Sequence, residues 1–155
     1  MNPLRRNVLK GATGASVVAV AVAAGLLKPT QVLAEYNQTA FAANNVADAY
    51  RGMGISSPAE SSAISIKGPD IAENGAVVPV EITSNIPGTT SISVMAEKNI
   101  TPLLGQFNFS NGTEGYIATR IKMASTANVR AIVIAGGKAY TATKEVKVTI
   151  GGCGG

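Results

Sequence analysis

The residue best suited to chemistry in this chain is Cys153, which stands in the C-terminal segment Gly151-Gly152-Cys153-Gly154-Gly155. It is the only cysteine among 155 residues. A cysteine thiolate is nucleophilic and can hold a covalently bound group. Because the chain has no second cysteine, an intramolecular disulfide is excluded. The position and the flanking glycines predict a free, accessible thiol.

The flanking residues Gly151, Gly152, Gly154 and Gly155 predict a narrow, flexible arm, because glycine lacks a Cβ and restricts the backbone little. Fully extended, the stretch from Gly151 to Cys153 spans roughly 10 Å. An arm of this kind can bring a thiol into a narrow cleft of another protein, where bulkier side chains would not fit.

The sequence offers the thiol no partner for catalysis. The chain contains no histidine, which excludes a Cys-His pair and histidine metal sites. A nucleophilic enzyme needs a neighbouring base, and the carboxylate of Gly155 disfavours the thiolate. We therefore expect a carrier that has no catalytic residue, metal or cofactor of its own, and whose thiol is activated by the enzymes that it visits.

Residues 1–34 predict an export signal. Arg5 and Arg6 provide a basic start of the twin-arginine type, an apolar segment without charge follows over 11–27, and small residues precede a cleavage site after Ala34. An uncleaved membrane anchor is the alternative. It is less favoured, because the apolar segment is short and rich in Gly and Ala, whereas a transmembrane helix needs roughly 20 strongly apolar residues.

Export by the twin-arginine route has two consequences for function. The expected location is the periplasm, and the protein is exported folded, either with a cofactor or with a partner. Because the sequence shows no cofactor motif, we expect a partner. Removal of the signal takes away Arg5, Arg6, Lys10 and Lys28, which leaves equal numbers of basic and acidic residues. This neutral balance gives no electrostatic signature of nucleic-acid binding.

The mature chain reads as a short helical part followed by strands. Apolar residues at spacings of three and four predict one helix from Glu35 to Met53, ended by Gly52 and Gly54. The helix and a polar linker over 56–62 make up residues 35–62. Residues 63–150 alternate apolar and polar side chains in seven stretches separated by turn residues. The predicted strands are 63–67, 76–83, 90–96, 103–109, 116–123, 129–135 and 139–150.

These elements predict a mainly β protein: an immunoglobulin-like antiparallel β-sandwich of about seven strands, with an N-terminal helix and a flexible arm over 151–155. Pro79 cannot donate to a sheet ladder and predicts an edge or a bulge. We expect solvated basic side chains at Arg120, Lys122, Arg130 and Lys147. A candidate region for a partner, although each of its members also fits the core, comprises Phe41, Tyr50, Leu103, Leu104 and Phe107.

The terminal Gly-Gly-Cys-Gly-Gly segment, after a β-rich domain with an N-terminal helix and a twin-arginine-like signal, closely resembles SoxY, the sulfur-carrier subunit of the periplasmic thiosulfate-oxidising (Sox) system. The resemblance implies that Cys153 is the attachment site for sulfur intermediates, and that the neighbouring glycines form the swinging arm. It also implies a heterodimer with a SoxZ subunit. The implied enzymes are a c-type cytochrome, a di-manganese hydrolase and, in some organisms, a molybdenum-haem dehydrogenase.

Three other interpretations of Cys153 remain open at this point. The cysteine could be an inert residue in a frayed tail. It could join two copies of an exported structural β-sandwich through a disulfide. It could also serve a thiol-dependent peroxidase or exchange protein, although such an enzyme lacks a resolving cysteine here. A covalent adduct on the thiol would distinguish a carrier from a structural module, and turnover by the isolated chain would indicate an enzyme.

Overall fold

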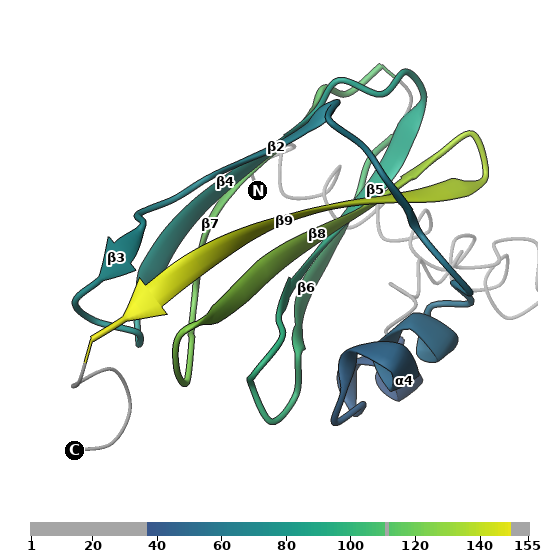
Figure 1. Cartoon of the computed structure of the whole chain (residues 1–155). Coiled ribbons are helices and arrows are strands. Elements are labelled where there is room, and N and C mark those ends of the chain that lie inside the picture. The colour runs from purple at the N-terminus through teal and green to yellow at the C-terminus, as the bar shows by residue number, and fades with distance from the viewer. Residues whose placement is uncertain (1–36, 111, 150–155) are drawn as a thin grey trace, which may run out of the picture. The chain divides into compact units, whose positions relative to one another are not determined.

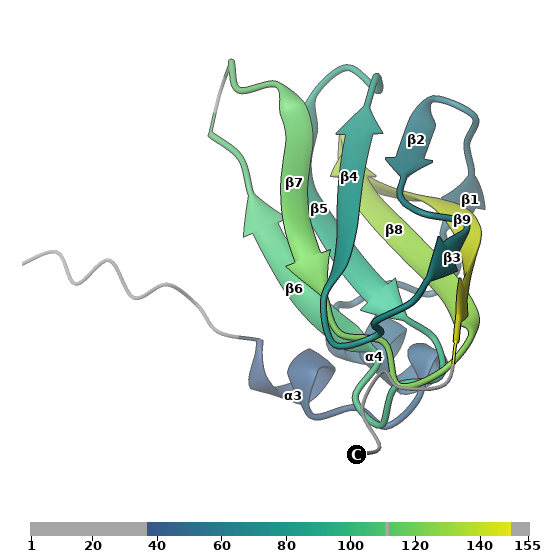
Figure 2. The same cartoon turned by 90° about the vertical axis from the view of Figure 1, so that its left-hand side faces the viewer.

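A computed structural model of the chain describes residues 37–110 and 112–149. Two β-sheets face each other, and two short helices precede the strands at the N-terminal end of the described residues (Figures 1 and 2). Each of the seven predicted strands is present within a few residues of its expected limits. They are β2 (Ile64–Lys67), β4 (Val78–Ser84), β5 (Thr89–Ala96), β6 (Leu103–Asn108), β7 (Gly115–Ile121), β8 (Ala127–Ala135) and β9 (Lys138–Val148).

The larger sheet is 6-stranded, in the order β1-β9-β8-β5-β6 with β3 also paired to β9, and the smaller is 3-stranded, in the order β2-β4-β7. The sequence analysis missed β1 (Ala59–Glu60) and β3 (Ile71–Ala72). The first lies within the predicted linker. Both pair parallel to β9, so the otherwise antiparallel sandwich has two parallel contacts. Strands of two residues are too short to show an alternating pattern.

The main core lies between the two sheets. In β4, Val78, Val80 and Ile82 are buried and alternate with exposed or half-buried neighbours. These side chains pack against buried residues of the larger sheet, such as Ile92 and Val94. This alternation is the period-2 pattern of a strand with one face buried, and it is the reason why the strands could be predicted.

Pro79 lies in β4, the central strand of its sheet, and β4 pairs with β7 past the proline without the predicted bulge. The pairing shows how the sheet tolerates this proline. Pro79 faces Arg120 of β7 on one side, whereas the pairing of β2 with β4 covers only Ile64–Lys67 and Glu81–Ser84. The proline therefore stands just beyond β2 and has a paired strand on one side only, so the predicted edge is present locally at Pro79.

The predicted single helix is two helices, α3 (Gln38–Phe41) and α4 (Val46–Gly52). Asn45 separates them, because it adopts an extended conformation and its side chain caps α4 by accepting from the backbone N–H of Asp48 at 2.8 Å. Gly52 also has a packing role. A Cβ there would lie 2.6 Å from the backbone nitrogen of Ala40, so only glycine permits this close approach.

The helices cover the outer face of the larger sheet and form a second core. Ala40 and Ala49 from the helices pack with Met95, Leu103 and Ile132 from the strands. Arg130, expected on a solvated face, instead forms an ion pair with Glu97 in this layer. Its Nε donates to Glu97 Oε1 at 2.8 Å, and its side chain is only 22% exposed. The expectation for Arg130 is wrong because β8 is covered on both faces.

Candidate functional site

The residues predicted to carry the function lie outside the described residues. This applies to Cys153, to Gly151, Gly152, Gly154 and Gly155 of the arm, and to Arg5 and Arg6 of the export signal. The structure does describe the root of the arm, up to Thr149. The geometry of this root sets the position at which the C-terminal segment leaves the sandwich.

The root is the end of β9. Strand β8 accompanies β9 only as far as the pair Ala127–Val146. Beyond that point β3 takes over on the opposite side, pairing Ile71 with Lys147 and Ala72 with Val148. The strand therefore keeps a neighbour up to its last residue, although it has left the main body of the sheet.

Hydrogen bonds from both sides hold the last three described residues. On the β3 side, the N–H of Lys147 donates to the carbonyl of Asp70 at 2.9 Å, and the N–H of Thr149 donates to the carbonyl of Ala72 at 3.1 Å. On the other side, the N–H of Val148 donates to the Thr126 hydroxyl at 2.9 Å. The same hydroxyl lies 3.4 Å from the carbonyl oxygen of Val148.

The Thr126 hydroxyl thus takes the place that a neighbouring strand would occupy, because it serves the N–H and the C=O of one residue. Backbone polar groups without partners are costly when shielded from water. The arrangement therefore keeps β9 ordered to its end with a single side chain in place of a longer β8.

An ion pair lies beside the same junction. Lys144 Nζ lies 2.5 Å from Asp70 Oδ1. The hydrogen bond and the charge of Lys144, with a smaller effect of the Lys147 charge, lower the pKa of Asp70 below its usual value. The Asp70 side chain is 90% exposed, so water screens this pair, and its effect on stability is small.

Three loops at this end of the sandwich are bonded to one another. The N–H of Met123 donates to the carbonyl of Gly75 at 2.7 Å. The Asn99 side chain donates to the carbonyl of Lys122 at 2.7 Å and accepts from the N–H of Ala124 at 2.9 Å. Together with the Thr126–Val148 contact, these bonds connect the β3–β4, β5–β6 and β7–β8 loops to the end of β9. We call this connected structure the arm-root framework.

Sequence reasoning did not identify Thr126, Asn99 or Asp70 as residues that position the arm. Each stands in a polar loop stretch, where Ser, Thr, Asn and Asp are common for reasons of turn formation. Their partners are far away along the chain, for example 74 residues between Asp70 and Lys144. The single available signal is that all three fall in loops, and this is too general to select them.

The five residues of the predicted partner region do not form one face. Leu103 is buried in the helix-side core, and Phe41 and Tyr50 pack around it. Leu104 packs against the other core, between the sheets. Phe107, on edge strand β6, is 37% exposed. The proposed region is therefore wrong as a single surface.

Tyr50 has a distinctive environment under the helices. Its hydroxyl is buried beside Arg130 and Thr141, at a geometry short of a hydrogen bond to any described residue. Burial raises the pKa of Tyr50, and the nearby Arg130 charge offsets part of this effect. The Tyr50 side chain packs against the helix-side core and lines a hollow of about 470 Å³ beside α4.

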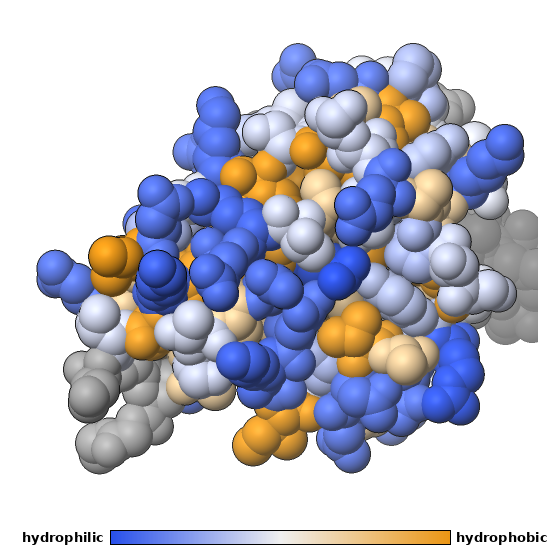
Figure 3. Space-filling model, in the orientation of Figure 1, coloured by the Kyte–Doolittle hydropathy of each residue, from blue (hydrophilic) through white to orange (hydrophobic). Residues whose placement is uncertain are grey.

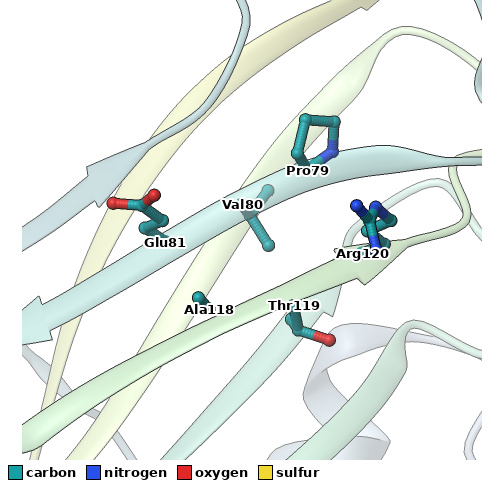
Figure 4. Close-up of a pocket in the computed structure, with 6 residues that line it drawn as sticks. All are labelled: Pro79, Val80, Glu81, Ala118, Thr119 and Arg120. Atoms are coloured by element: carbon teal, nitrogen blue, oxygen red, sulfur yellow. The ribbon is translucent and has the colours of Figure 1, made fainter.

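A shallow hollow of about 560 Å³ lies along β4 and β7. Figure 4 shows its lining residues, with Glu81 and Arg120 at opposite ends and Ala118 and Thr119 between them. The two charged groups do not converge on a common point. This arrangement lacks the clustered polar groups of a ligand site.

Two further features concern the described residues only. No group of three or more Asp, Glu, His or Cys side chains is placed to hold a metal ion in this part of the chain. In the same part, no helix has the length and apolar character required to cross a membrane.

Comparison with known proteins places the chain in a family. The family model described as "Sulfur oxidation protein SoxY" matches residues 49–153, a range that ends on Cys153. The sulfur carrier protein SoxY from Chlorobium limicola f thiosulfatophilum has a similar structure, with a TM-score of 0.63 and 44% sequence identity over 70% of this chain and 96% of that chain.

A superoxide reductase (neelaredoxin) from Ignicoccus hospitalis is more distant, at 18% identity and a TM-score of 0.48 over 56% of this chain and 79% of that one. A search of curated proteins finds no match. The match to the family model and the similarity to the Chlorobium protein, taken together, show that the chain belongs to the SoxY family of sulfur oxidation proteins.

Proposed function

We propose that the chain carries sulfur intermediates covalently on Cys153 during thiosulfate oxidation and presents them to partner enzymes. The observation that carries this proposal is the SoxY family match, which extends to Cys153 in its glycine-flanked terminal segment. The similar Chlorobium structure is that of a sulfur carrier protein. The alternative, a structural module that dimerises through a terminal disulfide, does not require the glycines on both sides of the cysteine.

In the proposed reaction cycle, the sulfur intermediate stays covalently bonded to the Cys153 sulfur until the last hydrolysis. In the first step, the Cys153 thiolate and the sulfane sulfur of thiosulfate form a sulfur–sulfur bond, and two electrons pass to a c-type cytochrome. In the second step, a hydrolase adds water and cleaves the terminal S–SO₃ bond, which releases sulfate and two protons and leaves a persulfide on Cys153.

The persulfide is then oxidised to a sulfonate on the cysteine sulfur. Three waters supply the oxygens, and six electrons and six protons leave. A second hydrolysis releases sulfate and returns the free thiolate. The oxidant is a molybdenum-haem dehydrogenase where the organism has one. The carrier contributes attachment and presentation, and the catalytic groups and cofactors belong to its partners.

The geometry of the arm root supports a role of the chain in attaching and presenting the sulfur intermediates. The end of β9 is bonded to β3 on one side and to Thr126 on the other. Cys153 is four residues beyond Thr149, so its Cα can lie at most about 14 Å from that of Thr149. A fixed root with a short, glycine-rich arm confines the cargo to a small volume. This raises its effective concentration at the mouth of an enzyme bound to the same end.

The proposed setting follows from the N-terminal segment. We propose that residues 1–34, with Arg5 and Arg6, direct twin-arginine export, and that the protein works in the periplasm in a heterodimer with a SoxZ-like subunit. One signal would then export both folded subunits. The proposed domain limits are 35–62 for the helical part with its linker, 63–150 for the sandwich and 151–155 for the arm.

The proposal is tested with Cys153→Ser in a reconstituted thiosulfate-oxidising system. We expect thiosulfate-dependent reduction of the cytochrome to fall to background, because an alcohol does not form the sulfur–sulfur bond, while the complex with the SoxZ-like subunit is retained. Ser62→Ala, a change at an exposed turn residue near the opposite end of the sandwich, serves as the matched control and should retain the wild-type rate. Undiminished activity of Cys153→Ser would rule out a covalent carrier.

A further inference from the structure

The end of the sandwich at which β9 terminates carries exposed aliphatic side chains. Ile71 is 58% exposed, Val77 52% and Ile100 84%. They are three of the five large hydrophobic side chains that are exposed among the described residues. Single exposed apolar residues are ordinary on a protein surface, so the informative feature is that three of them stand around one end.

Contacts within the arm-root framework place each of the three residues at that end of the sandwich. Ile71 belongs to β3 and pairs with Lys147 of β9. Val77 directly precedes β4, whose first residue faces Ile121 at the end of β7. Ile100 follows Asn99, which is bonded to the β7–β8 loop. The two ribbon views agree that these loops and the end of β9 lie at the same end (Figures 1 and 2).

These side chains are held outward by ordered backbone. The loop that presents Ile100 is fixed by both polar atoms of the Asn99 side chain and by the N–H of Asn99, which donates to the carbonyl of Ala96 at 3.1 Å. The exposure of Ile100 therefore results from a defined loop conformation. The space-filling view shows separate apolar patches among polar side chains along the lower edge of the molecule (Figure 3).

The length of chain after the root limits where a partner can bind. Cys153 is the fourth residue after Thr149, so its Cα can lie at most about 14 Å from that of Thr149. An enzyme that acts on Cys153 inside a cleft must bring the mouth of that cleft within this distance. Such an enzyme covers the end of the sandwich that carries Ile71, Val77 and Ile100.

We propose that Ile71, Val77 and Ile100 form the docking surface for the enzymes that act on cargo bound to Cys153, and that these enzymes present an apolar rim around the cleft. The inference rests on the proposed carrier function and adds to it a recognition surface outside the arm. Exposed charges of both signs, such as Glu73, Lys98 and Lys122, surround the aliphatic residues. Apolar contact, rather than one sign of charge, is therefore the common element for partners.

Docking of this kind is weak and rapidly reversible. Three aliphatic side chains bury far less area than a stable interface, which needs about 1,200 Å² or more. A carrier that visits several enzymes requires this property, because a tight complex with one enzyme would exclude the next. The arm supplies the specificity for the reacting sulfur, and the docking surface brings the enzyme to the arm.

The test uses the full mature chain, loaded with thiosulfate on Cys153, as the substrate of the purified sulfate-releasing hydrolase. Ile100→Asp is compared with Tyr116→Asp. Tyr116 is also exposed, at 45%, but stands near the start of β7, five residues and about 17 Å from the end of that strand. A loaded peptide of residues 149–155 serves as a second substrate that lacks the docking surface altogether.

We expect Ile100→Asp to raise KM about tenfold with kcat unchanged within about twofold, because the side chain contributes to binding and not to the chemical step. Tyr116→Asp should leave both constants unchanged. The peptide should show a KM at least as high as that of Ile100→Asp. Wild-type KM for Ile100→Asp, or equal KM for the peptide and the full chain, would overturn the docking surface.

Failure of the proposed function can be distinguished from failure of the docking surface. Intact mass of the incubated chain reports whether Cys153 accepts cargo at all. Binding of the unloaded Cys153→Ser chain to the hydrolase, measured by calorimetry with and without Ile100→Asp, reports docking alone. An adduct together with binding that Ile100→Asp does not weaken would refute only the docking surface. Absence of any adduct would refute the carrier function.

Discussion

The hydroxyl of Thr126 lies 2.9 Å from the backbone nitrogen of Val148 and accepts its hydrogen. This contact closes one side of β9 where β8 has already ended, while β3 closes the other side. A side chain from a loop 22 residues away thus defines the point from which the C-terminal segment leaves the sandwich. The place from which the C-terminal segment continues is therefore a property of the folded domain.

Thr126→Val removes the hydroxyl and keeps the shape of the side chain. We expect a loss of about 1 kcal/mol in the free energy of unfolding, because the N–H of Val148 loses its partner. Hydrogen exchange at the Val148 amide should become faster, while exchange in the centre of β8 should change little. Thr126→Ser keeps the hydroxyl and is the matched control. Equal exchange rates at Val148 in all three proteins would show that the hydroxyl does not hold the root.

The Glu97–Arg130 pair allows a comparison between a shielded and an exposed ion pair. Both side chains are less than one quarter exposed, at 23% and 22%, whereas Arg51 in its pair with Asp48 is 79% exposed. We expect Glu97→Gln to reduce the free energy of unfolding by about 1–2 kcal/mol, after allowance for partial solvent screening, because Arg130 loses a charged acceptor.

Asp48→Asn, the control at the exposed pair, should reduce it by less than about 0.5 kcal/mol. Urea denaturation of the two variants measures both effects. If the two substitutions were equally costly, the shielded pair would have no special part in holding the β5–β6 loop to β8.

The lowered pKa of Asp70 predicts a pH dependence with a definite sign. The folded state binds the Asp70 proton less readily than the unfolded state, because Lys144 bonds to the carboxylate. The contribution of this pair is therefore complete above the ordinary aspartate pKa of about 3.9 and is lost as the pH falls through the lower pKa of the folded state.

Asp70→Asn should accordingly lower the midpoint of urea unfolding slightly at pH 6. The difference from the wild type should shrink as the pH falls below the ordinary aspartate pKa, and it should disappear once the folded state of the wild type is protonated as well. A constant difference from pH 6 to pH 2 would show that the Asp70 carboxylate acts through something other than its charge.

Gly152→Val tests the requirement for a slender arm. A valine restricts the backbone and adds width beside Cys153. We expect thiosulfate loading and sulfate release to slow at least several-fold, with the unfolding midpoint unchanged. Gly152→Ala should lie between the two proteins. A Gly152→Val chain that is loaded and processed at the wild-type rate would contradict the role assigned to the glycines.

The sequence was most informative where one physical pattern dominated. The alternation in β4 and β7 predicted those strands, because each has one buried face. The pattern could not show that β1 and β3 exist, since pairs such as Ile71–Lys147 are made by two residues distant along the chain. It also predicted one helix where Asn45 starts a second, because apolar spacing alone does not register a capping side chain.

The candidate site likewise contains residues that the sequence could identify and residues that it could not. Cys153 and its glycines could be singled out from residue type and position, since a lone cysteine between glycines has few structural uses. The arm-root framework could not, because Thr126, Asn99 and Ala72 act through contacts that only the fold creates. Arg130 illustrates the same limit: its alternation with apolar neighbours indicated a solvated face, and the helices that cover that face lie far away in sequence.

The most direct test of the central claim is the intact mass of the protein purified from its own periplasm, first without and then with reductant. A carrier predicts a chain that begins at residue 35 and bears sulfane, thiosulfonate or sulfonate adducts. Peptide mapping should place these adducts on Cys153, and reductant should remove them in part. A free thiol without adducts, or a disulfide between two copies as the sole modification, would contradict the account.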